Sequence, residues 1–208
     1  MNKGLMILVI LAMILMGCGS SKDTIIPTIE EINLDEGYTI IWYGRSKVYR
    51  YDEGEWIRSE ENDYEFTVTQ KRIGNTWKSI KNMHRRHPDF NTMFGDRNQT
   101  MYFEVDYYDV KGDTVYANVT STLGDGKVVA DKDFRHTVIT MYPKTNVFMP
   151  YNKFRITQHY DYEKGLLTET VELLKETDGV ETPFMKNEEI AYFFVRGKLD
   201  EAPTVYQK

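Results

Sequence analysis

Six cationic side chains lie close together in the middle of the sequence, and no acidic residue separates them. They are Lys71, Arg72, Lys78, Lys81, Arg85 and Arg86, between Phe66 and Pro88. Basic residues near an anionic membrane surface contribute about 1 kcal/mol each to binding. We therefore predict an anionic-surface contact made by Lys78, Lys81, Arg85 and Arg86. The alternative is that these cations pair with the acidic block of residues 52–65 or lie in solvent.

His84 and His87 are the residues that most resemble a pair of metal ligands. One helical turn could bring them together, but the two arginines between them repel a cation and the glutamate of a zincin motif is absent. Asp131 and Asp133 do not have the spacing of an EF-hand loop. The sequence also lacks a G-x-S-x-G motif. We predict no metal site, no cofactor and no enzymatic activity.

The lone cysteine of the chain, Cys18, follows a short apolar segment near the amino terminus. Lys3 precedes twelve residues without a polar side chain, Leu5–Met16, and Gly17 comes just before the cysteine. A transmembrane helix needs about 20 apolar residues. A basic residue, a shorter apolar run and a small residue are instead the layout of a secretory signal peptide. With one cysteine, no intramolecular disulfide can form.

The segment Leu15-Met16-Gly17-Cys18 resembles the lipobox of bacterial lipoproteins, which has a leucine three residues before an invariant cysteine and a small residue just before it. The resemblance implies cleavage between Gly17 and Cys18 and acylation of the Cys18 thiol. It also implies export across the inner membrane and a membrane anchor, through acyl chains, in the bacterial cell envelope. Because Gly19 follows the cysteine, the resemblance favours the outer membrane over the inner one. It concerns the amino-terminal segment and leaves the rest of the chain unassigned.

The chain that remains after such cleavage is mildly acidic and long enough for one domain. Removing 17 of the 208 residues leaves 191, and losing Lys3 changes the net charge from −6 to −7. This charge argues against nucleic-acid binding. We expect residues 1–17 to be a cleaved signal peptide, residues 18–36 a tether, and residues 37–208 a single β-rich domain.

Alternating apolar and polar residues around short glycine-containing turns predict a series of β-hairpins. The predicted pairs are Lys47–Tyr51 with Glu55–Arg58, Met101–Val110 with Thr114–Leu123, and Phe154–Tyr162 with Leu166–Lys175, although Leu166–Lys175 also has helical propensity. Trp77, Ile80 and Met83 have helical spacing before Pro88, which predicts one helix near 76–87. About 10–11 strands with one helix predict a mainly β fold, either an antiparallel β-barrel or a strongly curved sheet.

Adjacent aromatic residues suggest what such a sheet could bind. They occur as Trp42-Tyr43, Tyr102-Phe103, Tyr107-Tyr108 and Phe193-Phe194, so that each pair places one ring on either face of a strand. One set can pack the core while the other lines a cavity or an exposed platform. We therefore expect an envelope-anchored binding module for an apolar or lipid-like ligand. The alternative is an envelope assembly protein, or a phage-encoded surface lipoprotein, that acts through a protein partner.

Overall fold

The computed structural model describes residues 39–73, 75–90, 96–144, 150–161 and 163–196. The predicted signal peptide, Cys18 and the predicted tether lie outside these ranges. The strands are β1 (Thr39–Asp52), β2 (Glu55–Arg58), β3 (Tyr64–Ile73), β4 (Thr76–His84), β5 (Asn98–Lys111), β6 (Thr114–Ser121), β7 (Gly124–Asp131), β8 (His136–Pro143), β9 (Lys153–Asp161), β10 (Leu166–Thr177) and β11 (Val180–Arg196). Among the described residues, the one helical element is a short 3-10 turn, η1 (Glu60–Asn62), and no helix is long and apolar enough to cross a membrane.

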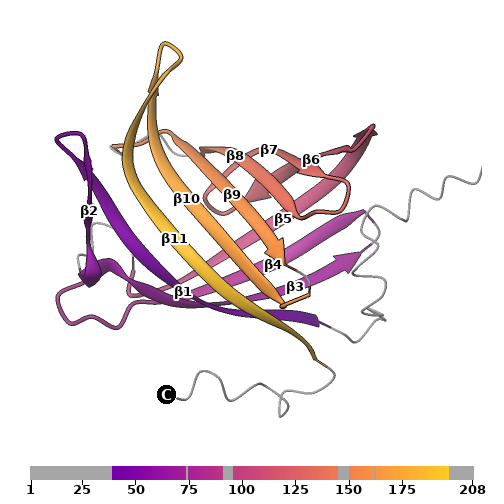
Figure 1. The fold of residues 1–208 in the computed structure, drawn as a ribbon, viewed down its shortest axis with the longest axis horizontal. Coiled ribbons are helices and arrows are strands. Elements are labelled where there is room, and N and C mark those ends of the chain that lie inside the picture. Colours follow the sequence, from indigo (N-terminus) through magenta and orange to yellow (C-terminus); the bar gives the residue numbers. More distant parts are fainter. Residues whose placement is uncertain (1–38, 74, 91–95, 145–149, 162, 197–208) are drawn as a thin grey trace, which may run out of the picture.

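The strands form a closed antiparallel barrel, which is one of the two architectures that the sequence predicts. From β3 to β11 each strand pairs with the next one along the chain, and β1 pairs with β3 on one side and with β11 on the other. The closed part therefore contains ten strands, whereas β2 pairs only with the far end of β1 and projects from the rim (Figure 1). Closure leaves all ten barrel strands with two neighbours each.

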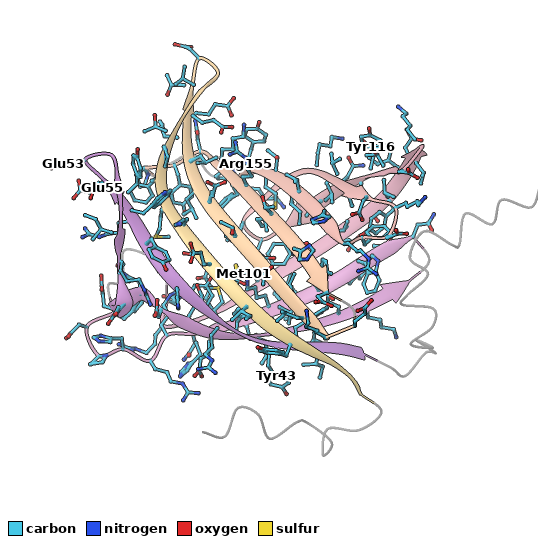
Figure 2. All side chains as sticks on the ribbon, viewed as in Figure 1. Tyr43, Glu53, Glu55, Met101, Tyr116 and Arg155 are labelled. Carbon is cyan, nitrogen blue, oxygen red and sulfur yellow. The ribbon has the colours of Figure 1, made fainter. Side chains whose placement is uncertain are left out.

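Alternation along each strand sends apolar side chains inward. In β6, Val115, Ala117 and Val119 are buried between more exposed polar neighbours. The adjacent aromatic residues Tyr102 and Phe103 divide in the same way, since Phe103 faces the interior while Tyr102 is 55% exposed. Figure 2 likewise shows Met101 within the barrel and side chains on its outer face as well. The period of two in the sequence thus corresponds to the inner and outer faces of the wall.

Tight turns and one close contact explain several glycines. Glu53-Gly54 and Asp178-Gly179 have positive φ angles at both residues, as two-residue hairpin turns require. Gly44 lies in β1 opposite Phe66, where an added Cβ would come within 2.2 Å of the phenyl ring. The absence of a side chain at Gly44 therefore lets the Phe66 ring lie across the inner face of β1.

The prediction of a helix near 76–87 is wrong, because residues 76–84 form strand β4. Trp77 and Met83 point inward with Lys81 between them, while Ile80 is 38% exposed on the outside. The charged residue at an inward position concealed the alternation and left only the helical spacing of the apolar residues visible. The segment Leu166–Lys175, for which strand and helix were both possible, is part of strand β10.

Candidate functional site

The interior of the barrel contains a cavity of about 260 Å³. Aromatic and aliphatic side chains from every side of the wall surround it, including those of Trp77, Met101, Phe103, Phe154 and Ile156. An eight-stranded barrel is just wide enough to be filled by side chains or to hold one small ligand, and more strands give a wider interior. For comparison, an apolar cavity of about 150 Å³ is enough to bind benzene. The cavity is therefore large enough for a small apolar molecule or a short alkyl chain.

A row of polar side chains interrupts this apolar lining on one side. Ser46 of β1 lies opposite Glu189 of β11, and Glu189 lies opposite Glu169 of β10. The row continues through Gln158 of β9 to Thr137 of β8. Residues that lie in register on neighbouring antiparallel strands have side chains about 5 Å apart on the same face. These five residues therefore form a continuous row, which we call the polar belt.

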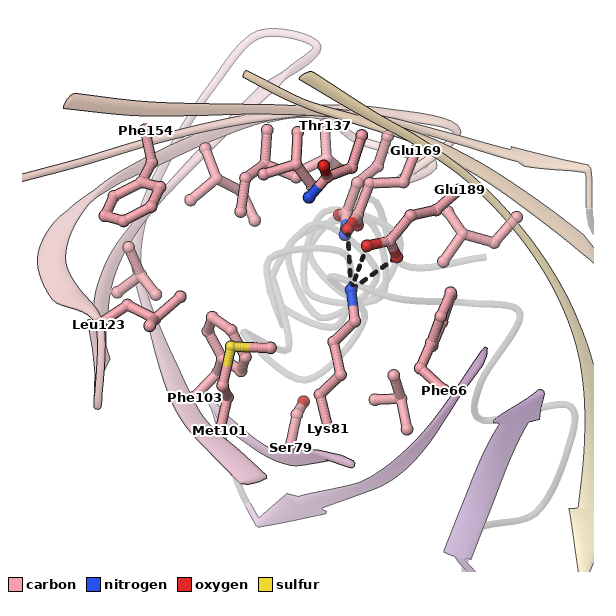
Figure 3. A pocket seen from close by; sticks show the side chains of 18 of the residues that line it. Phe66, Ser79, Lys81, Met101, Phe103, Leu123, Thr137, Phe154, Glu169 and Glu189 are labelled. Carbon is pink, nitrogen blue, oxygen red and sulfur yellow. Dashed lines mark hydrogen bonds and ion pairs between the residues drawn. The ribbon is translucent and has the colours of Figure 1, made fainter. Parts of the chain in front are cut away.

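Lys81 reaches the polar belt from the opposite wall (Figure 3). Its ammonium lies 2.7 Å from Glu189 Oε1, 2.6 Å from Glu189 Oε2 and 3.4 Å from Glu169 Oε1. Only 10%, 2% and 8% of the side chains of Lys81, Glu189 and Glu169 are exposed. One cation and two carboxylates thus meet inside the barrel. We call these three residues the inner triad.

Tyr64 and Asn187 extend the triad's hydrogen-bond network. The Tyr64 hydroxyl donates to Glu189 Oε1, and Asn187 Nδ2 donates to the Tyr64 oxygen at 3.1 Å. Gln158 Nε2 donates to Glu169 Oε2. Burial, and then the negative charge of Glu189, raise the pKa of Tyr64 well above its usual value, so Tyr64 remains a neutral donor. Both carboxylates therefore accept hydrogen bonds from neutral side chains as well as from Lys81.

Burial dominates the protonation behaviour of the triad. It raises the pKa of Glu189 to about 7, with the charge of Glu169 acting in the same direction and the nearby ammonium of Lys81 opposing it. For Lys81, burial alone would lower the pKa, but the attraction of Glu189 and Glu169 outweighs it and raises the pKa. The lysine therefore stays charged, while Glu189 exchanges its proton near neutral pH.

Four buried side-chain polar atoms have no hydrogen-bond partner among the described residues. Two of the four belong to residues that line the cavity, namely the indole nitrogen Nε1 of Trp77 and the amide oxygen Oδ1 of Asn187. Buried polar atoms are nearly always hydrogen-bonded in native proteins, so such exceptions call for an explanation. One is a donor and the other an acceptor, and both belong to residues that a bound molecule could reach.

The structure separates the four cations predicted to form one anionic-surface contact. Lys81 and Arg85 are buried, whereas Lys78 and Arg86 lie on the outside, where they pair with Glu104 at 3.1 Å and Glu65 at 2.6 Å. Alternation along β4 is the cause, because residues an odd number of positions apart point to opposite faces. The four side chains therefore cannot act on one surface.

Arg85 closes one end of the cavity instead. Its guanidinium donates to the backbone carbonyl of Asp96 at 2.5 Å and lies 4.9 Å from the centre of the Phe90 ring and 5.6 Å from that of Tyr64. Cations stack favourably on aromatic faces, more so where water is excluded. This arrangement fixes Arg85 at the end of the barrel, just beyond β4.

Sequence analysis missed Glu169, Glu189, Tyr64 and Asn187 as site residues. A signal was present in their positions: Glu169 lies between Leu167 and Val171, in the inward phase of its strand. A charged residue at an apolar phase of an alternating strand marks an unusual environment. Finding its partners required the strand register, which no local pattern contains. Comparison with protein-family models gave no match, and comparison with curated proteins gave none either.

Proposed function

We propose that this protein is a lipoprotein of the bacterial envelope whose barrel binds an apolar or lipid-like ligand. The observation that carries the binding proposal is the apolar cavity of about 260 Å³ inside a closed barrel. Ligand sites are typically concave and mainly apolar, with a few convergent polar groups that fix orientation. The inner triad supplies such groups. The proposed anchor at Cys18 rests on the lipobox resemblance alone.

Buried charge supports a binding role over a purely structural one. Removing an ion from water costs several kcal/mol even after relaxation, and well-packed apolar residues in place of a buried ion pair are often neutral or stabilising. Lys81, Glu169 and Glu189 are thus less favourable for stability than apolar residues would be at the same positions. A role in binding a polar group of a ligand would explain their presence in the barrel interior.

The alternative of a protein-binding surface has less support from the described residues. The most exposed outward tyrosines are Tyr102 and Tyr108 on β5, Tyr142 on β8 and Tyr192 on β11. These strands lie three or more apart around the barrel. Exposed apolar residues also meet in small groups, Ile80 opposite Tyr102 and Val129 opposite Val138. Small apolar groups of this kind are normal on protein surfaces, and docking sites typically have larger patches.

A matched pair of substitutions in β7 tests the binding proposal. Val128 is 3% exposed and lines the cavity, whereas Val129 is 43% exposed on the outside. The phenyl ring of Val128→Phe enters the cavity, so we expect affinity for the neutral fluorescent probe N-phenyl-1-naphthylamine to fall at least about tenfold. Val129→Phe should bind the probe like the wild type. Equal affinity in both variants, with both folded by circular dichroism, would refute an interior site.

The anchor has its own test. Cells that express the full chain are labelled with radioactive palmitate, and the wild type is compared with Cys18→Ala. The proposal expects label on the wild type and none on the variant. Equal labelling would show that Cys18 is not the acylated residue.

A further inference from the structure

When both of its glutamates are ionised, the inner triad carries more negative than positive charge. Lys81 faces two carboxylates, Glu169 and Glu189, which lie directly opposite one another on β10 and β11. Among the described residues that line the cavity, the only other charged one is Arg85. At about 3.3 Å per residue, the backbone of Arg85 lies roughly 13 Å beyond that of Lys81, just past the end of β4. Arg85 is also engaged with the Asp96 carbonyl and two aromatic rings.

Lys81 is shared unequally between the two carboxylates. Its ammonium contacts both oxygens of Glu189 at 2.6 and 2.7 Å but reaches Glu169 only at 3.4 Å. That longer distance is beyond the usual range for a charge-assisted hydrogen bond. Among the described residues, Glu169 otherwise accepts one hydrogen bond, from Gln158. A carboxylate can accept about four. Glu169 therefore keeps unused acceptor capacity at the edge of the cavity.

Aromatic rings beside the triad also favour positive charge. The Lys81 ammonium lies 4.4 Å from the centre of the Phe66 ring, which shows that this part of the cavity accommodates a cation against an aromatic face. Trp77 and Phe103 supply further aromatic surface in the lining. A negatively charged group brought to the same place would meet two carboxylates in a region of low dielectric constant.

We infer that the ligand of this barrel is an apolar molecule that carries a protonated amine, which binds to Glu169. The apolar part occupies the cavity and the ammonium donates to the free lone pairs of Glu169, so that each carboxylate has a cation of its own. This inference rests on the proposed interior site and specifies its ligand. The inference also excludes one class of ligand, since the same apolar chain with a carboxylate in place of the amine should not bind in the cavity.

The test compares three ligands that share one eight-carbon chain and differ in the head group. Octylamine, 1-octanol and octanoate are titrated at pH 8, where Glu189 is ionised, against the full chain loaded with N-phenyl-1-naphthylamine, and displacement of the probe reports affinity. A charge-assisted hydrogen bond should make octylamine bind about tenfold or more tightly than octanol. Octanoate should bind more weakly than octanol. Equal or tighter binding of octanoate would overturn the inference.

The variant Glu169→Gln tests whether Glu169 is responsible for the preference for octylamine, and Glu172→Gln is the control. Glu172 lies on the outer face of the same strand, where it pairs with Arg155 at 3.4 Å. We expect Glu169→Gln to remove the preference for octylamine over octanol, while Glu172→Gln keeps it. An unchanged preference in Glu169→Gln would overturn the assignment of Glu169.

The outcomes separate the two proposals. If the probe and all three ligands fail to bind the folded wild type, the interior site and the inference are both refuted. If the three ligands bind equally well, the interior site stands and the amine preference is refuted. Because the order of the three affinities is measured on the wild type, it does not depend on how well a variant folds.

Discussion

Two glutamate pairs on the same two strands show how much the surroundings change the chemistry of an ion cluster. Glu169 lies opposite Glu189 and shares Lys81 with it inside the barrel. Nearer the β10–β11 turn, Glu176 lies opposite Glu181, and Lys153 contacts both at 2.8 Å. We call this second set the outer triad. Its glutamate side chains are each 29% exposed, against 8% and 2% in the inner triad.

Glu181 of the outer triad and Glu189 of the inner triad have pKa values shifted in opposite directions. Hydrogen bonds from Arg155 and then Lys153 lower the pKa of Glu181 below its usual value. In the inner triad, burial raises the pKa of Glu189 in spite of an equally close lysine. The outer triad also has a second cation, Arg155, and no described residue supplies a second cation to the inner triad. A lysine between two glutamates thus lowers the pKa of a glutamate near the surface but does not prevent burial from raising the pKa of Glu189 inside.

Removal of the lysine should reveal the largest difference in stability between the two triads. Lys81→Met leaves two facing carboxylates in the interior without their cation, and breaking a buried ion pair in this way costs about 3–5 kcal/mol. We expect the free energy of unfolding, measured in urea at pH 7, to fall by that amount. A loss below about 1 kcal/mol would show that the inner triad is solvated like the outer one.

The pH dependence of stability should show the next largest effect. Because the pKa of Glu189 is about 7 in the folded protein and near 4.5 otherwise, the folded state holds a proton that the unfolded chain has released between these values. Stability should therefore decline as pH rises from about 5 to 8, by roughly 2–3 kcal/mol.

Glu189→Gln is the control for this decline. The variant cannot titrate at this position, so its free energy of unfolding should change much less over the same interval. Carboxylates with a lowered pKa, such as Glu181 and Asp161, lose their stabilising effect only at pH below their ordinary values. They therefore do not mask the decline between pH 5 and 8. Parallel curves for wild type and variant would contradict the role of Glu189.

Of these changes, Lys153→Met should have the smallest effect on the free energy of unfolding. The partly exposed glutamates remain hydrated, and Arg155 still contacts Glu181 and Glu172. Such partly exposed ion pairs contribute up to about 1 kcal/mol, and salt screens them. We expect a loss of less than about 1 kcal/mol in urea unfolding, which shrinks further in 1 M NaCl. A loss as large as that of Lys81→Met would remove the distinction between the two triads.

The sequence was most informative where the strands follow simple alternation. Hairpins around Gly54, Gly112 and Gly165 were predictable because turn chemistry and alternation indicate the same structure there. Strand β4 was not predictable in this way, since Lys81 takes an inward position where a strand ordinarily has an apolar residue. The wrong helix prediction for residues 76–87 and the failure to predict the inner triad therefore both arise from the inward position of Lys81.

The membership of the inner triad depends on distant parts of the chain. Lys81 precedes Glu169 by 88 positions and Glu189 by 108. No local pattern encodes such pairings, because they follow from the register of each of the strands between them and from barrel closure. Even with the correct strands, only the complete register brings the lysine to the two glutamates.

The seam between β1 and β11 is the pairing that closes the barrel. All the other neighbouring barrel strands are close in sequence, whereas the β1–β11 pairing, from Thr39 with Arg196 to Arg50 with Met185, joins the two ends of the described chain. Contacts between distant segments form slowly, and the amino-terminal strands emerge first during synthesis. Since Glu189 belongs to β11, the principal partner of Lys81 arrives with the strand that closes the wall. The buried ammonium of Lys81 therefore gains its principal counter-ion only when β11 closes the wall against β1.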